Sequence, residues 1–307
     1  MLAAVITAFG GPGVFALTEA PEPGGDVVDV TLAGVNHADV HRRRGEYERP
    51  PLPAVLGADV VGRRRSDGRR VAALLRAGGG YAQVAPAHHV VELPGDVGDE
   101  QALAVLEQGL TAWHSLHTLG RVGADDVVVI TAAAGGVGHL AVQLARAAGA
   151  RVIGLASSPA ERAFLTGLGA HACADSNHPD LGAALDETPT LVLDSVGGRT
   201  FEQLHGALAP FGRIVAYGGA ADMPNTVAVD DLMTASTGVL GFRLQRVLDD
   251  EELYRSSAAR LFHLAGRGLL SARIGGRYPL SAVGRAHADL ESRTTSGKLV
   301  IDVHRLV

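Results

Sequence analysis

The sequence is poor in cysteine and in lysine. Cys173 is the only cysteine among the 307 residues, which excludes an intramolecular disulfide and any zinc site built from several cysteines. Lys298 is the only lysine, so arginine supplies nearly all of the positive charge. Because the net charge is −6, we do not expect nucleic acid as a partner, and we interpret the three-arginine runs at 42–44 and 63–65 as solvated turns.

The sequence also lacks an apolar run of about 18 residues and an N-terminal signal segment. We therefore expect no membrane contact and a cytoplasmic protein. The composition is otherwise that of an ordinary globular protein, with 47% hydrophobic and 20% charged residues. A chain of this length suffices for two domains with substantial cores.

The pattern of apolar residues changes near Asp99. Before it, short β-branched segments separated by Gly and Pro predict a β-rich, barrel-like domain. After it, helical stretches alternate with apolar strands, as a parallel doubly wound sheet requires; these strands begin near residues 127, 151, 190, 213 and 238. The last part is too short for a domain of its own. The predicted fold is thus α/β, with one domain formed by 1–107 and 246–307 and a Rossmann dinucleotide-binding domain at 108–245.

The stretch after Val127 carries the strongest functional signal. A buried strand leads into a tight turn close to G-x-G-x-x-G, with Ala133 in the first glycine position and then Gly135 and Gly138. In such a turn the backbone approaches a pyrophosphate, and the following helix offers free N–H groups and a positive dipole end. The pattern predicts a dinucleotide site, with a purely structural turn as the alternative.

The end of the second strand bears on the choice between NADH and NADPH. About 20 residues after the turn, an NAD-selective protein places an acid that binds the ribose 2′-hydroxyl. Here Ser157 and Ser158 stand at that position, and Arg162 follows one helical turn later. These residues suit a 2′-phosphate and predict NADPH. The alternative is that Ser158 only caps the next helix and that Arg162 is solvated.

With these segments placed, the chain resembles the zinc-free quinone oxidoreductases of the medium-chain dehydrogenase/reductase superfamily over nearly its whole length. Several motifs in the same order carry this resemblance: Val35–Asp39 with Gly45–Tyr47, Leu52–Asp59, Gly78–Ala82, Gln108–Ala112, Ala132–Gly138, Asp194–Gly198 and Glu291–Lys298. The resemblance implies a GroES-like catalytic domain beside the Rossmann domain. It also implies an NADPH-dependent enzyme that transfers hydride to a quinone or an α,β-unsaturated carbonyl.

The resemblance assigns roles residue by residue. In the chain's own numbering, the pyrophosphate turn is matched by Gly135, Gly136, Val137 and Gly138. Thr111 matches the residue near the nicotinamide, and Arg293 matches an arginine that reaches the cofactor's phosphate region. Asn36 and Tyr47 match polar residues at the substrate end of the cleft, where they are the candidates for binding the acceptor's oxygen.

The zinc alcohol dehydrogenases are the nearest relatives to reject. The positions of their catalytic zinc ligands are occupied by Asn36, Ala58 and Gln108, none of which replaces the expected cysteine, histidine and cysteine. His37 and His41 stand four residues apart, as two metal ligands on a helix do, but no third ligand is apparent. His41 matches a proton-relay histidine of those enzymes, so a role as a proton donor stays open.

The same residues leave three functions open and predict one oligomeric state. The protein is a general quinone or enone reductase, or a pathway-specific enoyl reductase or tailoring enzyme for a polyketide-like enone, or a non-catalytic NADPH-binding protein. The segments Val227–Val229 and Gly238–Phe242 are candidate strands at the far edge of the cofactor sheet. An unpaired apolar edge favours pairing with a second copy, and the resemblance also implies a homodimer.

Overall fold

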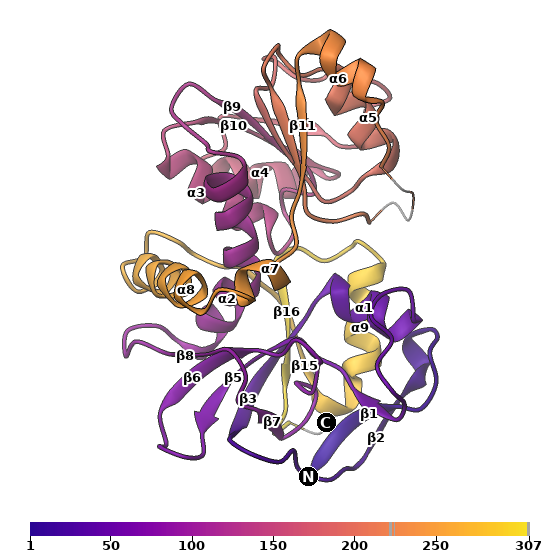
Figure 1. Cartoon of the computed structure of the whole chain (residues 1–307), viewed down its shortest axis with the longest axis vertical. Coiled ribbons are helices and arrows are strands. Elements are labelled where there is room, and N and C mark those ends of the chain that lie inside the picture. Colours follow the sequence, from indigo (N-terminus) through magenta and orange to yellow (C-terminus); the bar gives the residue numbers. More distant parts are fainter. Residues whose placement is uncertain (221–222, 224, 306–307) are drawn as a thin grey trace. The chain divides into compact units, whose positions relative to one another are not determined.

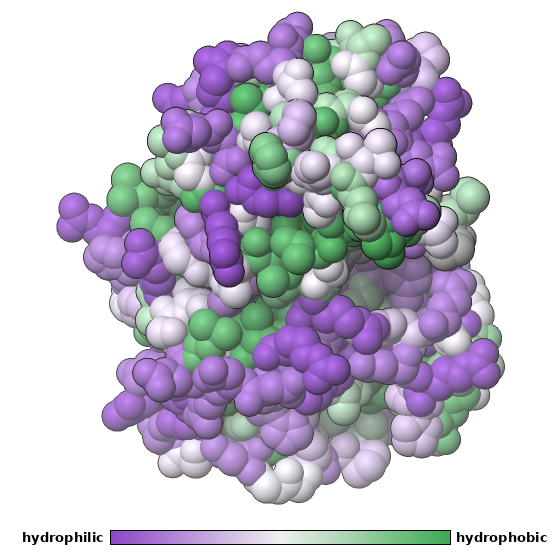
Figure 2. Space-filling model, turned by 45° about the horizontal axis from the view of Figure 1, so that its top comes forward, coloured by the Kyte–Doolittle hydropathy of each residue, from purple (hydrophilic) through white to green (hydrophobic). Residues whose placement is uncertain are grey.

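The computed structural model describes residues 1–220, 223 and 225–305, which form two compact units (Figure 1). The first unit comprises Met1–Glu107 and Gln245–Val307, and the second comprises Gln108–Leu244. Among the described residues, no helix combines the length and the apolar character that crossing a membrane requires. Figure 2 shows hydrophilic residues over much of one face, with hydrophobic residues gathered in patches among them.

The first unit is β-rich. Its larger sheet has the order β15-β16-β3-β5-β6-β8, with β7 also paired to β3, and its smaller sheet has the order β2-β1-β4. The strands are β1 (Leu2–Ile6), β2 (Phe15–Glu19), β3 (Val27–Val35), β4 (Ala54–Val55), β5 (Asp59–Arg64), β6 (Arg70–Leu74), β7 (Val84–Pro86), β8 (Val90–Glu92), β15 (Ile274–Pro279) and β16 (Lys298–Asp302).

Helices of the first unit connect these strands. They are η1 (Pro12–Val14), α1 (His37–Arg44), α7 (Gln245–Leu248), α8 (Glu251–Gly266), η3 (Leu280–Ala282) and α9 (Val283–Glu291), while α2 (Asp99–Trp113) runs across the boundary into the second unit. The last strand, β16, pairs antiparallel with β3, with Leu299 opposite Val35. This pairing places Lys298, from the end of the chain, beside Asn36, which follows β3.

The second unit has a six-stranded sheet of order β11-β10-β9-β12-β13-β14, in which all pairs are parallel. Its strands are β9 (Val127–Ile130), β10 (Arg151–Ala156), β11 (Ala172–Asp175), β12 (Leu191–Asp194), β13 (Arg213–Ala216) and β14 (Gly238–Gly241). Its helices are η2 (His114–Leu119), α3 (Gly138–Ala147), α4 (Pro159–Gly167), α5 (Gly198–Gly206) and α6 (Val229–Ala235). Figure 1 shows α3 and α4 on one side of this sheet and α5 and α6 on the other. The predicted doubly wound sheet is therefore confirmed.

Two details of the second unit differ from the sequence prediction. Val227–Val229 is not a strand, because residues 225–228 have no regular structure and Val229 begins α6. Two carboxylates in the first turn of that helix, Asp230 and Asp231, favour a helix N-terminus there. In addition, β11 was not predicted, since its sequence Ala-Cys-Ala-Asp has no β-branched residue.

Candidate cofactor and active site

The order of strands reverses between β9 and β12, where the chain passes from one half of the sheet to the other. Ligands of doubly wound sheets bind outside the carboxyl ends of the strands at such a switch point. The segments that follow β9 and β12 are the glycine turn at 132–138 and the turn at 195–198. These two turns therefore define the candidate cofactor site of the second unit.

The glycine turn is built for close approach. A Cβ on Gly138 would lie 2.5 Å from the carbonyl oxygen of Ala132 and 2.6 Å from the Cα of Ala133, so only glycine fits where α3 begins. Ala132, rather than Ala133, has the positive φ of 44°, which shows that the strained position is one residue before the first glycine position. Gly135, Gly136 and Val137 are half-buried and lie just before the N-terminus of α3.

His139 fixes this turn in a way that the sequence analysis missed. Its imidazole Nδ1 bonds the carbonyl oxygen of Gly135 at 2.7 Å, and the residue is fully buried. The available signal was a histidine in a first helical turn whose other residues are glycine, leucine and alanine. A pyrophosphate held by the turn would thus meet backbone N–H groups whose geometry is set by a buried side chain.

The end of β10 is arranged differently from the expectation. Ser158 caps α4 by accepting a hydrogen bond from the Glu161 backbone N–H, and the Glu161 carboxylate returns to the Ser158 N–H, which completes a capping box. The same carboxylate also accepts from the Ser157 N–H and hydroxyl at 3.1 and 3.0 Å. A carboxylate therefore lies where the sequence alone suggested that no acid stands.

Arg162 lies close to this position but turns toward the protein. Its guanidinium donates to the carbonyl oxygen of Ala156 at 3.1 Å and lies 3.7 Å from the carboxylate of Asp175. Asp175 ends β11, the neighbour of β10 in the sheet. The end of β10 thus brings together Ser157, Ser158 and Arg162. Two carboxylates lie there as well, and their negative charge would repel a bound phosphate.

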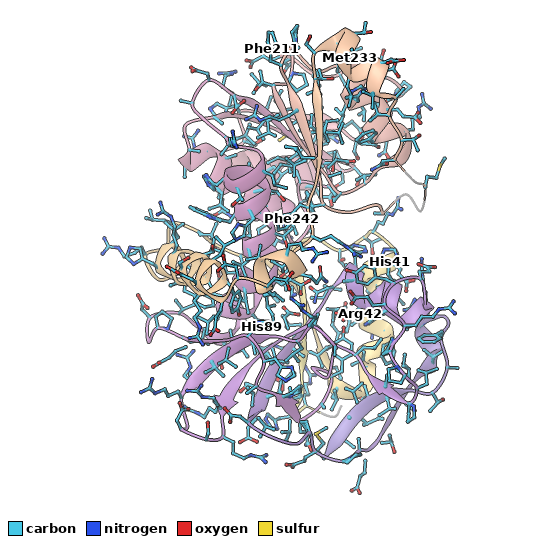
Figure 3. The ribbon with its side chains drawn as sticks, in the orientation of Figure 1. His41, Arg42, His89, Phe211, Met233 and Phe242 are labelled. Carbon is cyan, nitrogen blue, oxygen red and sulfur yellow. The ribbon has the colours of Figure 1, made fainter. Side chains whose placement is uncertain are left out.

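Thr111, the residue matched to the nicotinamide end, lies half-buried in α2. Three residues after it, α2 gives way to the π-helix η2, a widened turn that is frequent at functional sites. In η2 the buried His114 stacks on Phe242, which is labelled in Figure 3, and bonds the Thr118 hydroxyl at 2.8 Å. Burial lowers the pKa of His114 to about 4, so this imidazole is neutral at pH 7.

Asn36 lies in a buried polar network of the first unit. Its amide Nδ2 donates to the carboxylates of Asp59 at 2.7 Å and Asp39 at 3.2 Å, and its Oδ1 accepts from Lys298 Nζ at 2.6 Å. Lys298 also forms an ion pair of 2.7 Å with Asp59. Because both amide protons are used inside the protein, a direct bond from Asn36 to a substrate oxygen requires one of these bonds to open.

Burial sets the ionisation of this network. Asp39 and Asp59 are both 0% exposed, and Lys298 is 2% exposed. Loss of hydration raises the pKa of Asp39 to about 6, partly offset by the charge of Arg42. The Tyr81 hydroxyl bonds Asp39 at 3.3 Å and His287 at 3.0 Å, so the network extends into the core. The one lysine of the chain thus balances part of a buried negative charge.

Tyr47 lies on the segment that follows α1. Its half-buried ring lies under the Arg42 guanidinium, 5.7 Å from the ring centroid, and Arg42 is held by Glu48 at 2.8 Å. Gly45 ends α1 with a left-handed φ of 75°, and the Glu46 N–H then bonds the carbonyl oxygen of His41. This geometry brings the Glu46 carboxylate within 2.9 Å of His41 Nδ1.

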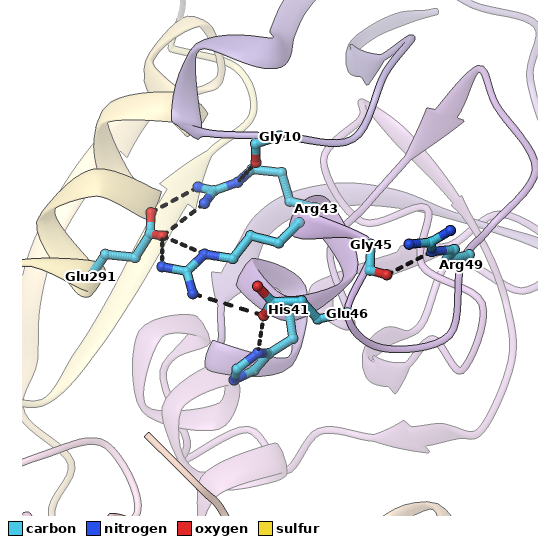
Figure 4. A network of polar contacts seen from close by, with 8 residues as sticks. Gly10, His41, Arg43, Gly45, Glu46, Arg49 and Glu291 are labelled. Atoms are coloured by element: carbon cyan, nitrogen blue, oxygen red, sulfur yellow. Dashed lines mark hydrogen bonds and ion pairs between the residues drawn. The ribbon is translucent and has the colours of Figure 1, made fainter. Parts of the chain in front are cut away.

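Figure 4 shows how the same helix is tied to α9. Arg43, which is 0% exposed, forms a two-point contact with the Glu291 carboxylate at 2.9 and 2.8 Å, and Arg44 reaches that carboxylate at 2.6 Å. Arg293 follows two residues later with a φ of 58°, in the left-handed region, and is exposed. The turn that carries Arg293 is therefore anchored through Glu291.

Among the described residues, no three His, Cys, Asp or Glu side chains lie close enough together to bind one metal ion. His41 bonds Glu46, and His37 stands exposed one helical turn before it. The three positions that correspond to zinc ligands hold Asn36, Ala58 and Gln108. The Asn36 amide is committed to the buried network.

Comparison with known proteins agrees with this architecture. Residues 22–95 match the alcohol dehydrogenase GroES-like domain, and residues 136–261 match the zinc-binding dehydrogenase family. The chain is 32% identical to a quinone oxidoreductase of Pseudomonas aeruginosa, covering 96% of this chain and 97% of the relative. The chain belongs to the quinone oxidoreductase subfamily of the medium-chain dehydrogenase/reductase superfamily.

Two further proteins are similar to the chain over nearly its whole length. A 2-haloacrylate reductase of a Burkholderia species is 29% identical, covering 98% of both chains. The structure of Escherichia coli quinone oxidoreductase complexed with NADPH has a TM-score of 0.93 and 28% identity, covering 99% of this chain and 100% of that one.

Proposed function

We propose that the protein is an NADPH-dependent, zinc-independent oxidoreductase that transfers hydride to a quinone or an α,β-unsaturated carbonyl. One observation carries the proposal: the glycine turn, fixed by Gly138 and His139, opens α3 at the switch point of a doubly wound sheet. The NADPH complex of the Escherichia coli relative supports the cofactor assignment. When bound, NADPH supplies the hydride and the protein supplies alignment and hydrogen bonds.

The residues of the chain have separate tasks in this proposal. The backbone of Gly135–Gly138 binds the pyrophosphate, Thr111 lies against the nicotinamide, and Arg293 reaches the phosphates. Tyr47 donates a hydrogen bond to the acceptor's oxygen, on which negative charge develops as the acceptor accepts hydride. Asn36 remains in the buried network and holds the start of α1, because both of its N–H groups are already used. The acceptor gains its final proton from Tyr47, His41 or water.

Steady-state oxidation of NADPH with a panel of quinones, 2-alkenals and cyclic enones tests the reaction. We expect at least one class to be reduced at a rate well above that with simple ketones. No reduction of any acceptor, with NADPH bound, would favour the alternative of a non-catalytic NADPH-binding protein. Elemental analysis of the purified protein is expected to find no stoichiometric zinc; about one zinc per chain would contradict the zinc-free site.

The likeness to 2-haloacrylate reductase supports a second candidate. In that case the protein is a pathway-specific reductase of a conjugated double bond, such as an enoyl reductase or a tailoring enzyme acting on a polyketide-like enone. The same panel separates the two candidates. A general quinone reductase accepts many quinones, whereas a pathway enzyme has a high kcat/KM for one enone and little activity with quinones.

We also propose that the protein is a homodimer. β14 is the edge strand of the parallel sheet, and apolar side chains are exposed on and near it: Leu240, Val229, Met233 and Phe211 are 37%, 68%, 72% and 85% exposed. Figure 3 shows Met233 on α6 and Phe211 at the same end of the second unit. An unpaired edge with exposed apolar side chains favours pairing with a second copy.

A further inference from the structure

Two threonines bridge the central strands β9 and β12, one at each end. At the carboxyl end, the Thr131 hydroxyl donates to Asp194 Oδ1 at 3.0 Å and accepts from the Ser195 N–H at 3.0 Å. At the amino end, the Thr190 hydroxyl donates to Asp126 Oδ1 at 2.6 Å and accepts from the Val127 N–H at 3.0 Å. In both bridges a threonine hydroxyl donates to an aspartate and accepts from a backbone N–H, but the bridges lie at opposite ends of the strands, and Asp126 also forms an ion pair of 2.9 Å with Arg213.

The Asp194 carboxylate holds the turn at 195–198 through the backbone N–H groups of that turn. Its carboxylate accepts from the Val196 N–H at 3.0 Å and from the Gly197 N–H at 3.1 Å. Gly197 and Gly198 have φ of 78° and 56°, and a Cβ on Gly197 would lie 2.8 Å from Asn225 Oδ1. Val196 is half-buried, so part of this residue is accessible at the turn. The turn thus has one conformation that the carboxylate selects.

The buried Thr131–Asp194 bridge costs more free energy than a purely structural contact between β9 and β12 requires. Asp194 is 0% exposed and Thr131 is 1% exposed. Within the described part of the chain, the donors around the Asp194 carboxylate are N–H and O–H groups rather than a lysine or arginine. Burying a carboxylate without a cation costs free energy that an apolar pair between these strands avoids. The two residues also stand at the switch point, where a ligand is expected.

We propose that Thr131 and Asp194 are positioning residues for NADPH, which act by holding the 195–198 turn as the second wall of the dinucleotide site opposite the glycine turn. This inference rests on the proposed function. Neither side chain touches the cofactor, since both are buried beneath the turn. The turn itself makes the contact, through its backbone and the exposed part of Val196.

The bridge at the amino end supplies the control. Thr131→Val and Thr190→Val each remove one hydroxyl from a bridge to an aspartate, and both are expected to lower the melting temperature. Only Thr131→Val is expected to raise the Kd for NADPH, by about tenfold, because it leaves the part-buried Ser195 N–H without its acceptor at the turn that is proposed to contact the cofactor. Thr131→Ser keeps the hydroxyl and is expected to stay within about twofold of wild type. Fluorescence titration with NADPH and thermal unfolding supply the two readouts.

Hydrogen exchange of the wild-type protein gives a second measurement if Thr131→Val fails to fold. NADPH is expected to slow exchange at the N–H groups of Val196 and Gly197, but not at that of Val127. Equal Kd values for the two valine variants, or no protection at 195–198, would overturn the inference and leave the proposed function intact. If wild type bound NADPH but reduced no acceptor, the proposed reaction would fall, and the binding comparison would still decide the role of Thr131 and Asp194.

Discussion

At the scale of single residues, we expect cofactor choice to depend on the Glu161 carboxylate as much as on the serines beside it. We expect wild type to bind NADPH more tightly than NADH, and Arg162→Glu to reduce this difference. Glu161→Gln keeps a side chain that completes the capping box but removes the charge that repels a 2′-phosphate. It is expected to strengthen NADPH binding about fivefold, with little effect on NADH. Fluorescence titrations with both cofactors check this, and an NADH preference of wild type would contradict it.

For Tyr47 the proposed chemistry predicts a loss of kcat of defined size. Removing one donor from a preorganised site costs about 10² to 10³ in kcat, and the delocalised charge of a conjugated acceptor places Tyr47→Phe at or below the lower value. Stability should change little, because the ring and its contact with Arg42 remain. Steady-state kinetics with the best acceptor measure the effect. An unchanged kcat/KM, together with efficient oxidation of ethanol by wild type, would show that both the site and the reaction are wrong.

At the scale of elements, the network of Asn36, Asp39, Asp59 and Lys298 joins α1 and β5 to the C-terminal strand β16. The pKa of Asp39 is raised to about 6, from an ordinary value of about 3.9, so the folded state favours the protonated form. The contribution of Asp39 to the free energy of unfolding is therefore greatest below about pH 4. It is lost as the pH rises to about 6, by an amount of up to about 3 kcal/mol.

Asp39→Asn removes this titration and gives the corresponding prediction. Relative to the variant, wild type should lose stability between about pH 4 and pH 6, and the difference should become constant above that range. Urea unfolding of both proteins across this range measures it. A difference that did not change with pH would show that Asp39 has the same pKa in the folded and the unfolded states.

The elements also show which information the sequence carries. The strands of the parallel sheet could be predicted because they are apolar runs bounded by Gly and polar residues, as at Val127–Ile130. The glycine turn could be predicted because its physical requirements are local. In contrast, β11 has no apolar run, and the 227–229 segment has a strand-like composition that the acidic start of α6 overrides.

Contacts that are distant in the sequence were beyond prediction. Lys298 and Asn36 lie 262 positions apart, and only the pairing of β16 with β3 brings them together. The sequence thus marked Asn36 as a candidate but gave no sign that its amide protons were already used. The contact of Glu161 with the Ser157 hydroxyl was local, but it depends on the entry angle of α4, which composition does not specify.

At the scale of the whole molecule, the proposed homodimer depends on the edge of the parallel sheet. We expect light scattering at micromolar concentration to give twice the chain mass of 31.6 kDa. Leu240→Arg places a charge on the exposed edge strand β14 and is expected to yield a monomer, because like charges would then meet across a two-fold axis. Leu269→Arg is the matched control, since Leu269 is 67% exposed in the first unit. A dimer that survived Leu240→Arg but dissociated with Leu269→Arg would move the interface to the first unit, and a monomeric wild type would contradict the dimer itself.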